Sequence, residues 1–206
     1  MARPVGADAE RTRARIREAA LTLFAERGLD GASVRAIARA ADVSLAMVHH
    51  YFGNKDGLYA ACVDSMYEGI TEQAGRLGET LAEEEPSAAL LEQAVREASR
   101  FARANQLAVR LLLRSVMDTG GLSAERRDRA LIPFLDRASH SLAPLVGRDA
   151  ASLRLPLQSV VFLVGRYAIS ADDELLAMTG TTASGQAAAE AVEDHLVAAS
   201  RALLGL

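Results

Sequence analysis

The chain has 206 residues, of which 50% are hydrophobic and 24% charged, so its composition excludes a disordered protein and leaves room for a buried core. The first residues are rich in Arg and acid rather than apolar, and polar residues interrupt the longest apolar stretch, Leu155 to Ile169. We therefore expect neither a signal peptide nor a membrane span, and the single cysteine, Cys62, favours a reducing, cytoplasmic setting.

Apolar residues at helical spacing, together with cap and turn residues, predict an all-α fold. No stretch alternates with the period of two that a strand requires. Pro133 is a predicted interruption within one of the helices. The predicted helices cover residues 10–27, 33–41, 45–52, 54–81, 87–103, 105–118, 123–145, 152–171, 174–178 and 183–204.

Cap and turn residues mark the first boundaries most clearly. Gly28 is a predicted C-terminal cap for the first helix, because glycine enters the left-handed region at little cost. Ser33 is a predicted N-cap for the second helix. Asp42, Val43 and Ser44 form a predicted tight turn between the second and third helices, and Ser44 can cap the helix that follows it.

Two short helices joined by a tight turn, with a third helix in front, are the smallest unit that reads DNA. The second helix of the pair enters the major groove, and the turn sets its angle. Charge agrees with this interpretation: residues 1–60 hold nine Arg or Lys against seven Asp or Glu, whereas residues 61–206 hold fourteen against twenty. The alternative is a helical protein-interaction module with no sequence-specific DNA binding, since any all-α protein has short helices and turns.

Nothing in the sequence indicates an enzyme. There is no Gly-rich phosphate loop, no nucleophile–base arrangement and no metal-ligand spacing, so no cofactor is predicted. The adjacent pair His49 and His50 is not a predicted metal site, because neighbouring residues on a helix point about 100° apart.

Many positions at once resemble the N-terminal domain of the TetR family of transcription regulators. The resemblance covers residues 12–60, and for residues 61–206 it extends only to architecture. It implies a helix-turn-helix domain over 1–60 and a helical effector-binding and dimerisation domain over 61–206. The stretches that carry it are Leu23-Phe24-Ala25-Glu26-Arg27-Gly28, Ser33-Val34-Arg35-Ala36-Ile37-Ala38, Ala41-Asp42-Val43-Ser44, Val48-His49-His50-Tyr51-Phe52 and Asn54-Lys55-Asp56-Gly57-Leu58-Tyr59.

The resemblance also implies a function and a set of DNA-contacting residues. The chain would be a regulator, most often a repressor in this family, that binds a pseudo-palindromic operator in double-stranded DNA as a dimer. Lys55, the only lysine beside twenty-two arginines, matches the family lysine that contacts phosphate. The residues at DNA-facing positions are Ser33, Arg35, Ser44, Leu45, Ala46, Met47, His49, Tyr51 and Lys55.

Three departures from the family pattern bear on DNA reading. Asp42 replaces the usual turn glycine and adds a negative charge. Leu45, Ala46 and Met47 offer almost no hydrogen bonds, so sequence choice would depend on thymine methyl groups and DNA shape. His49 replaces the usual tyrosine, so we expect DNA affinity to rise as the pH falls and imidazole takes up a proton.

The body is expected to dimerise and to bind an effector. Residues 152–171 and 183–204 are the expected homodimer interface, because the first range is too apolar for a peripheral helix and the second carries a stripe of small residues. The resemblance implies release from DNA by a small effector. An apolar pocket is the usual design, so the effector expected is hydrophobic or aromatic. The candidate ligand-binding residues are Phe101, Arg110, Arg114, Phe134, Phe162 and Arg166.

Overall fold

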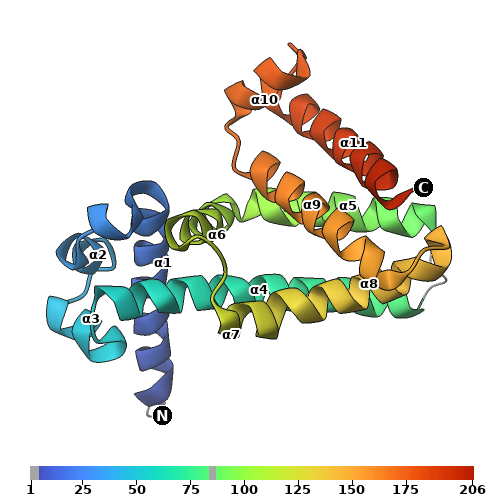
Figure 1. Cartoon of the computed structure of the whole chain (residues 1–206). Coiled ribbons are helices and arrows are strands. Elements are labelled where there is room, and N and C mark those ends of the chain that lie inside the picture. The colour runs from blue at the N-terminus through green and yellow to red at the C-terminus, as the bar shows by residue number, and fades with distance from the viewer. Residues whose placement is uncertain (1–4, 84–86) are drawn as a thin grey trace. The chain divides into compact units, whose positions relative to one another are not determined.

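The computed structural model describes residues 5–83 and 87–206, and every regular element in these ranges is helical (Figure 1). This confirms the all-α prediction. Among these residues, no helix is both long and apolar enough to cross a membrane. The helices are α1 Val5–Gly31, α2 Val34–Ala40, α3 Leu45–Phe52, α4 Lys55–Glu83, α5 Ala88–Ala104, α6 Gln106–Thr119, α7 Ala124–Arg126, α8 Ile132–Val146, α9 Ala150–Ala168, α10 Asp172–Thr179 and α11 Gly185–Leu204.

The chain divides into two compact units. The first comprises the residues up to Glu68 together with Arg110–Gly121, and the second comprises Gly69–Val109 and Leu122–Leu206. Of the three division points, those after Glu68 and Val109 fall inside helices α4 and α6, and the third follows Gly121 between α6 and α7. These compact units differ in their bounds from the expected domains 1–60 and 61–206, which remain a prediction.

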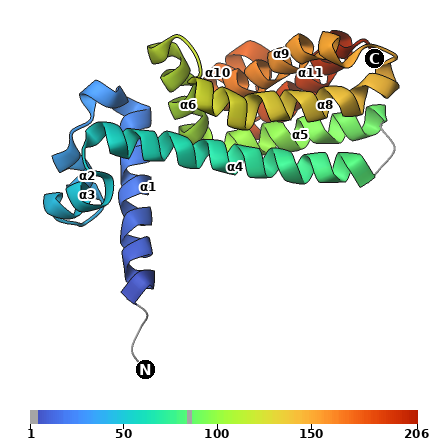
Figure 2. The same ribbon diagram turned by 60° about the horizontal axis from the view of Figure 1, so that its bottom comes forward.

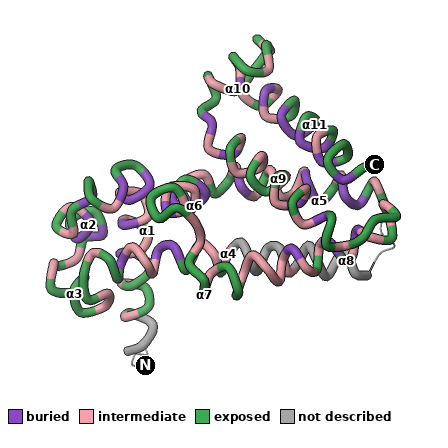
Figure 3. The backbone as a smooth tube through the Cα atoms, viewed as in Figure 1, coloured by how far each residue is buried: buried purple, intermediate pink, exposed green. Residues whose placement is uncertain are grey.

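The first unit encloses an apolar core between α1, α2, α3, the start of α4 and the end of α6. Ile16, Ala20 and Phe24 share one face of α1 because they follow the helical repeat, and all three are fully buried. Leu111 of α6 is equally buried in the same core. In Figure 3 these inward faces appear purple and the outward faces of α2 and α3 mostly green.

The first helix is longer than predicted. The helical span Val5–Gly31 is divided by a kink at Gly28, so the first helix begins five residues before the predicted range 10–27 and ends where predicted. Gly28 does take the expected positive φ, with φ 74° and ψ 178°, but a further helical turn follows it. The Arg114 guanidinium lies against this kink, since a Cβ built on Gly28 would come 3.0 Å from the Arg114 Nε atom.

The second unit is built around α9, which contacts α5, α8 and α11. The turned view in Figure 2 shows these helices side by side. The inward faces carry fully buried leucines, among them Leu153 and Leu196. Glu193 of α11 is only 8% exposed, and Arg100 of α5 donates to its carboxylate at 3.0 and 2.8 Å. The buried charge is therefore paired and hydrogen-bonded.

The predicted helix over 123–145 is not continuous. A π-helical turn, η1 (Arg127–Leu131), separates α7 from α8. The interruption thus precedes Pro133, which lies in the first turn of α8, where a missing N–H leaves no helical hydrogen bond unmade. The short helical turn predicted at 174–178 is the longer helix α10. It begins two residues earlier, at Asp172, and ends one residue later, at Thr179.

At the corner between α3 and α4, adding a single methyl group at Gly57 is expected to lower the stability of the protein. A Cβ on Gly57 would lie 2.4 Å from the Phe52 carbonyl oxygen, whereas a Cβ on Gly69, in the same helix, meets nothing within 4 Å. We expect Gly57→Ala to lower the free energy of unfolding by about 1–3 kcal/mol. Gly69→Ala should raise it by roughly 0.5–1 kcal/mol, as alanine does in a helix interior. Equal unfolding midpoints in urea for the two variants would contradict this account of the corner.

Candidate nucleic-acid interface

The second and third helices are joined as a helix-turn-helix. The Ser33 hydroxyl accepts a hydrogen bond from the Ala36 N–H at 3.1 Å, and the Ser44 hydroxyl accepts one from the Met47 N–H at 3.2 Å. Both predicted N-caps are therefore confirmed. In the turn, Asp42 takes the left-handed conformation with φ 51°, and the Val43 N–H donates to the Ala38 carbonyl at 3.0 Å.

The third helix presents a well-defined outward face. Val48 is buried, whereas Ala46, His49 and His50 are exposed and share the opposite side of the helix. Leu45 and Met47 are half-buried on the flanks. Sequence reasoning missed His50 as an outward residue. Its spacing of four from Ala46 could have revealed it.

His49 has one ring nitrogen engaged within its own helix end. Its Nδ1 lies 2.8 Å from the Gly53 carbonyl oxygen. Because a carbonyl oxygen only accepts, Nδ1 carries the proton of this hydrogen bond. In the neutral ring Nε2 is then an acceptor, and it becomes a donor only when the imidazole is protonated. His49 therefore offers an anion a hydrogen bond only in its charged form.

A series of ring contacts links α3 to α1. The rings of His50 and Tyr51 meet edge to face with centroids 5.2 Å apart, and those of Tyr51 and Phe52 are 6.4 Å apart. The Arg13 guanidinium of α1 then lies over the Phe52 ring, with Cζ 5.7 Å from its centroid. Tyr51 is half-buried against the core of the first unit, so these contacts restrain the end of α3.

The two other predicted cations flank this helix pair. Arg35 is exposed on α2, and Lys55 is half-exposed as the first residue of α4. In the part of the chain that the structure describes, neither forms a salt bridge with a carboxylate. The start of α4 is capped by Asn54, whose side-chain oxygen accepts from the Gly57 N–H at 2.8 Å. Both cations remain available to an anionic ligand.

The lone cysteine is a core residue. Cys62 is 2% exposed, and burial raises the pKa of its thiol to about 12. Its S–H donates to the Arg17 carbonyl at 3.7 Å. A thiol that stays protonated is neither a nucleophile nor a metal ligand. Among the described residues no three His, Cys, Asp or Glu side chains gather as a metal site would require.

The six candidate ligand-binding residues lie in different parts of the chain. Arg110 and Arg114 belong to the first unit, and Phe101, Phe134, Phe162 and Arg166 to the second. Phe101 and Phe134 are half-buried, and Phe162 is 52% exposed. Arg166 donates to the Ser170 hydroxyl at 2.6 Å and pairs with Glu174, whose pKa this hydrogen bond lowers.

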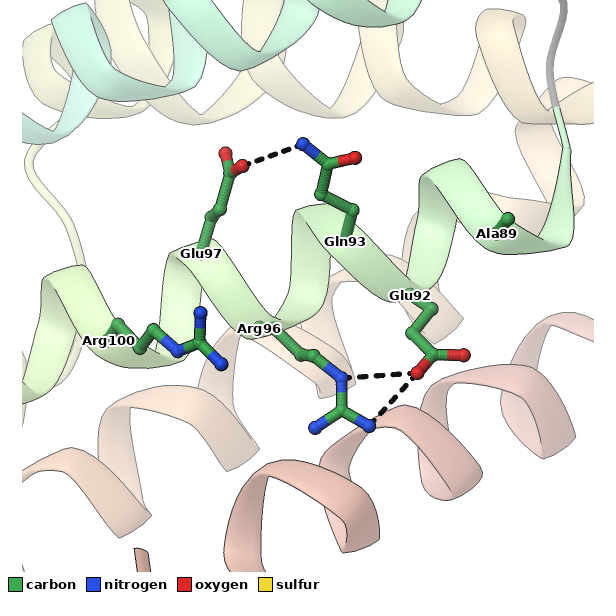
Figure 4. Close-up of a pocket in the computed structure, with 6 residues that line it drawn as sticks. All are labelled: Ala89, Glu92, Gln93, Arg96, Glu97 and Arg100. Carbon is green, nitrogen blue, oxygen red and sulfur yellow. Dashed lines mark hydrogen bonds and ion pairs between the residues drawn. The ribbon is translucent and has the colours of Figure 1, made fainter. Parts of the chain in front are cut away.

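One hollow on the second unit is lined entirely by α5. Figure 4 shows Glu92 bonded to Arg96 and Gln93 bonded to Glu97 along its wall. None of the candidate ligand-binding residues lines it. Its charged groups already have partners, since Arg96 pairs with Glu92 and Arg100 with Glu193 of α11. The hollow therefore lacks the apolar character expected of an effector pocket. The residues around it are Ala89, Glu92, Gln93, Arg96, Glu97 and Arg100.

The outward faces of α9 and α11 carry exposed apolar residues. On α9, Leu155 is 79%, Val161 41% and Phe162 52% exposed. On α11, the predicted stripe of small residues is exposed at Ala191, His195, Ala198 and Ala202. By contrast, Leu153, Leu157 and Ala168 of α9, which the sequence indicated for the interface, are buried in their own unit. Periodicity alone did not tell the inner stripe of α9 from its outer one.

Comparison with known proteins shows what the helix-turn-helix resembles. Residues 16–62 match the profile described as bacterial regulatory proteins, tetR family. The HTH-type transcriptional regulatory protein RaaS of Mycobacterium tuberculosis is 54% identical over 57 residues, which are 28% of this chain and 26% of that protein. The HTH-type transcriptional regulator PksA of Bacillus subtilis is 39% identical over 70 residues, which are 34% of each chain. The matches thus span about a quarter to a third of these relatives.

A solved structure extends the similarity to the whole chain. A TetR-like transcriptional regulator from Rhodococcus sp. RHA1 aligns over 100% of both chains with a TM-score of 0.62 and 22% sequence identity. Identity at this level shows the fold alone. Residues 16–62 therefore resemble the tetR family of bacterial regulatory proteins, and the complete chain shares the fold of this solved structure.

Proposed function

We propose that this protein is a transcription regulator that binds double-stranded operator DNA through α3 and acts as a repressor. The observation that carries the proposal is the outward face of α3, flanked by Arg35 and Lys55, neither of which forms an ion pair among the described residues. A helix of this kind, projecting from a tight turn, fits the major groove. The family of the helix-turn-helix domain supports this function and not an enzyme.

DNA reading by this helix would combine backbone contacts with few hydrogen bonds to bases. Leu45, Ala46 and Met47 can touch thymine methyl groups but offer no donor or acceptor side chain. The Ser33 and Ser44 hydroxyl hydrogens remain free to donate to phosphate, because each oxygen serves its cap as an acceptor. Sequence choice would therefore rest largely on methyl contacts and on the shape of the groove.

A homodimer through α9 and α11 would complete the regulator. One helix-turn-helix reads half of an operator, and two must be held about 34–36 Å apart to meet successive major grooves. The exposed Leu155 and Phe162 of α9, beside the small residues of α11, form an apolar surface that water would otherwise cover. A second copy of the same surface is the self-complementary partner that twofold symmetry provides.

The effector would be a small hydrophobic or aromatic molecule held by the second unit. Half-buried aromatic side chains such as Phe101 and Phe134 are suitable for its walls. Release from DNA requires only that the ligand bind more tightly to a conformation that fits the operator poorly. No charged group of the second unit is needed for this step.

Operator binding is tested by selection of random duplexes on the purified chain, followed by titration of the winner at several salt concentrations. We expect an enriched pseudo-palindrome and a plot of log affinity against log salt with a slope of about −0.9 for each phosphate neutralised. If no sequence is enriched and no duplex binds with a salt-dependent affinity, the proposal is wrong and a helical protein-interaction module is favoured.

The proposed dimer predicts the effect of one charge on α9. Phe162→Glu places a carboxylate in the surface that the second copy would cover, so we expect monomers in sedimentation equilibrium at micromolar concentration. Met117→Glu is the control, because Met117 is 81% exposed outside α9 and α11, and this variant should remain dimeric. Unchanged circular dichroism is expected for both, and a dimeric Phe162→Glu would refute the interface.

His49 predicts that operator binding strengthens in acid. When the His49 imidazole carries both protons, its Nε2–H is a donor that can bind a phosphate. A hydrogen bond between charged groups contributes roughly 1.5–3 kcal/mol, so affinity should rise about tenfold or more. His49→Gln should abolish this rise. His50→Gln should keep it, which separates the two neighbouring imidazoles, and equal pH profiles for all three proteins would disprove the role of His49.

A further inference from the structure

Arg13 is a surface cation that the structure holds beside the end of α3. It is exposed on α1, and its Cζ atom lies 5.7 Å from the centroid of the Phe52 ring. A guanidinium over an aromatic face is attracted by the ring electrons. A cation above one ring face keeps the N–H groups that point away from the ring free to donate. Arg13 is therefore oriented although it makes no ion pair within the described residues.

The position of Arg13 on its helix is distinctive. Successive helical residues are about 100° apart, so Arg11 and Arg15 point to the side of α1 opposite Arg13. Arg17, one turn further along, lies 4.0 Å from the Glu10 carboxylate. Of these four arginines, Arg13 is the one that has an aromatic ring of α3 beneath it.

A second cation begins α4 three residues after Phe52. The chain turns at Gly53, and Lys55 follows as the first residue of the new helix. The carbonyl end of α3 carries partial negative charge, which favours cations in its neighbourhood. Arg13 lies beside the Phe52 ring and Lys55 follows Phe52 by three residues, so two cations from different helices flank the end of α3. Among the described residues neither forms an ion pair, and cations so placed suit a phosphate group.

We propose that Arg13 is a further DNA-backbone contact, which Phe52 holds in position so that it grips a phosphate together with Lys55 where α3 enters the groove. This inference rests on the proposed function. Arg13 would position α3 on the duplex rather than read bases, because phosphate contacts set the register of a protein on DNA. This pair of phosphate contacts suits a recognition helix whose own outward face offers few hydrogen-bond donors.

The test compares two variants with the same loss of charge on the same helix. Arg13→Gln and Arg15→Gln are made in the full chain, and each is titrated with the selected operator and with an unrelated duplex of equal length. Arg13→Gln should weaken both affinities by roughly tenfold and reduce the salt slope by about 0.9 for each half-site bound. Arg15→Gln should leave the slope unchanged.

A double-mutant comparison tests the support from Phe52. Phe52→Leu keeps an apolar side chain but removes the ring, so Arg13→Gln should cost clearly less affinity in that background than in the unmutated chain. If Phe52→Leu fails to fold, Arg13→Lys replaces it, and a salt slope kept with a several-fold loss of affinity supports the stacked guanidinium. Equal salt slopes for Arg13→Gln and Arg15→Gln overturn this inference alone. Failure of the unmutated chain to bind any duplex overturns the proposed function as well.

Discussion

The orientation of α3 is the constraint on which the nucleic-acid interface depends. Val48 is its only fully buried side chain, while Tyr51 and Phe52 pack partly buried against the same core. Two corners set the direction of the helix. At the start, Asp42 in the left-handed region and the cap from Ser44 set the entry angle. At the end, the close approach of the Phe52 carbonyl to Gly57 sets the exit.

The second unit has a different constraint, because its central helix α9 has an apolar stripe on its inner face and another on its outer face. The inner stripe of α9 packs leucines against α5, α8 and α11. The outer stripe leaves Leu155 and Phe162 in water, at a free-energy cost that burial against another surface would recover. The link between Arg100 and Glu193 holds α5 to α11 through a nearly buried charge. Its geometry is specific, so α11 keeps one register while its small residues stay outside.

The features that could be predicted from the sequence are those fixed by interactions between residues close together in the chain. The caps at Ser33 and Ser44 and the ends of α2 and α3 follow from local hydrogen bonds, and they were predicted within a residue. The π-helical turn before α8 and the inner face of α9 depend on packing between distant segments, so periodicity did not reveal them. The same holds for the stacking of Arg13 on Phe52, which joins residues 39 positions apart. The candidate effector residues had no local signal at all.

The buried thiol of Cys62 has a practical consequence for work on this molecule. With its pKa raised to about 12, almost no thiolate exists near neutrality, and the sulfur is also shielded from solvent. Alkylating dyes therefore have no native target while the first unit is folded. A single cysteine placed on an exposed helix face can therefore carry a fluorescence or spin probe at a chosen position without first removing the natural residue.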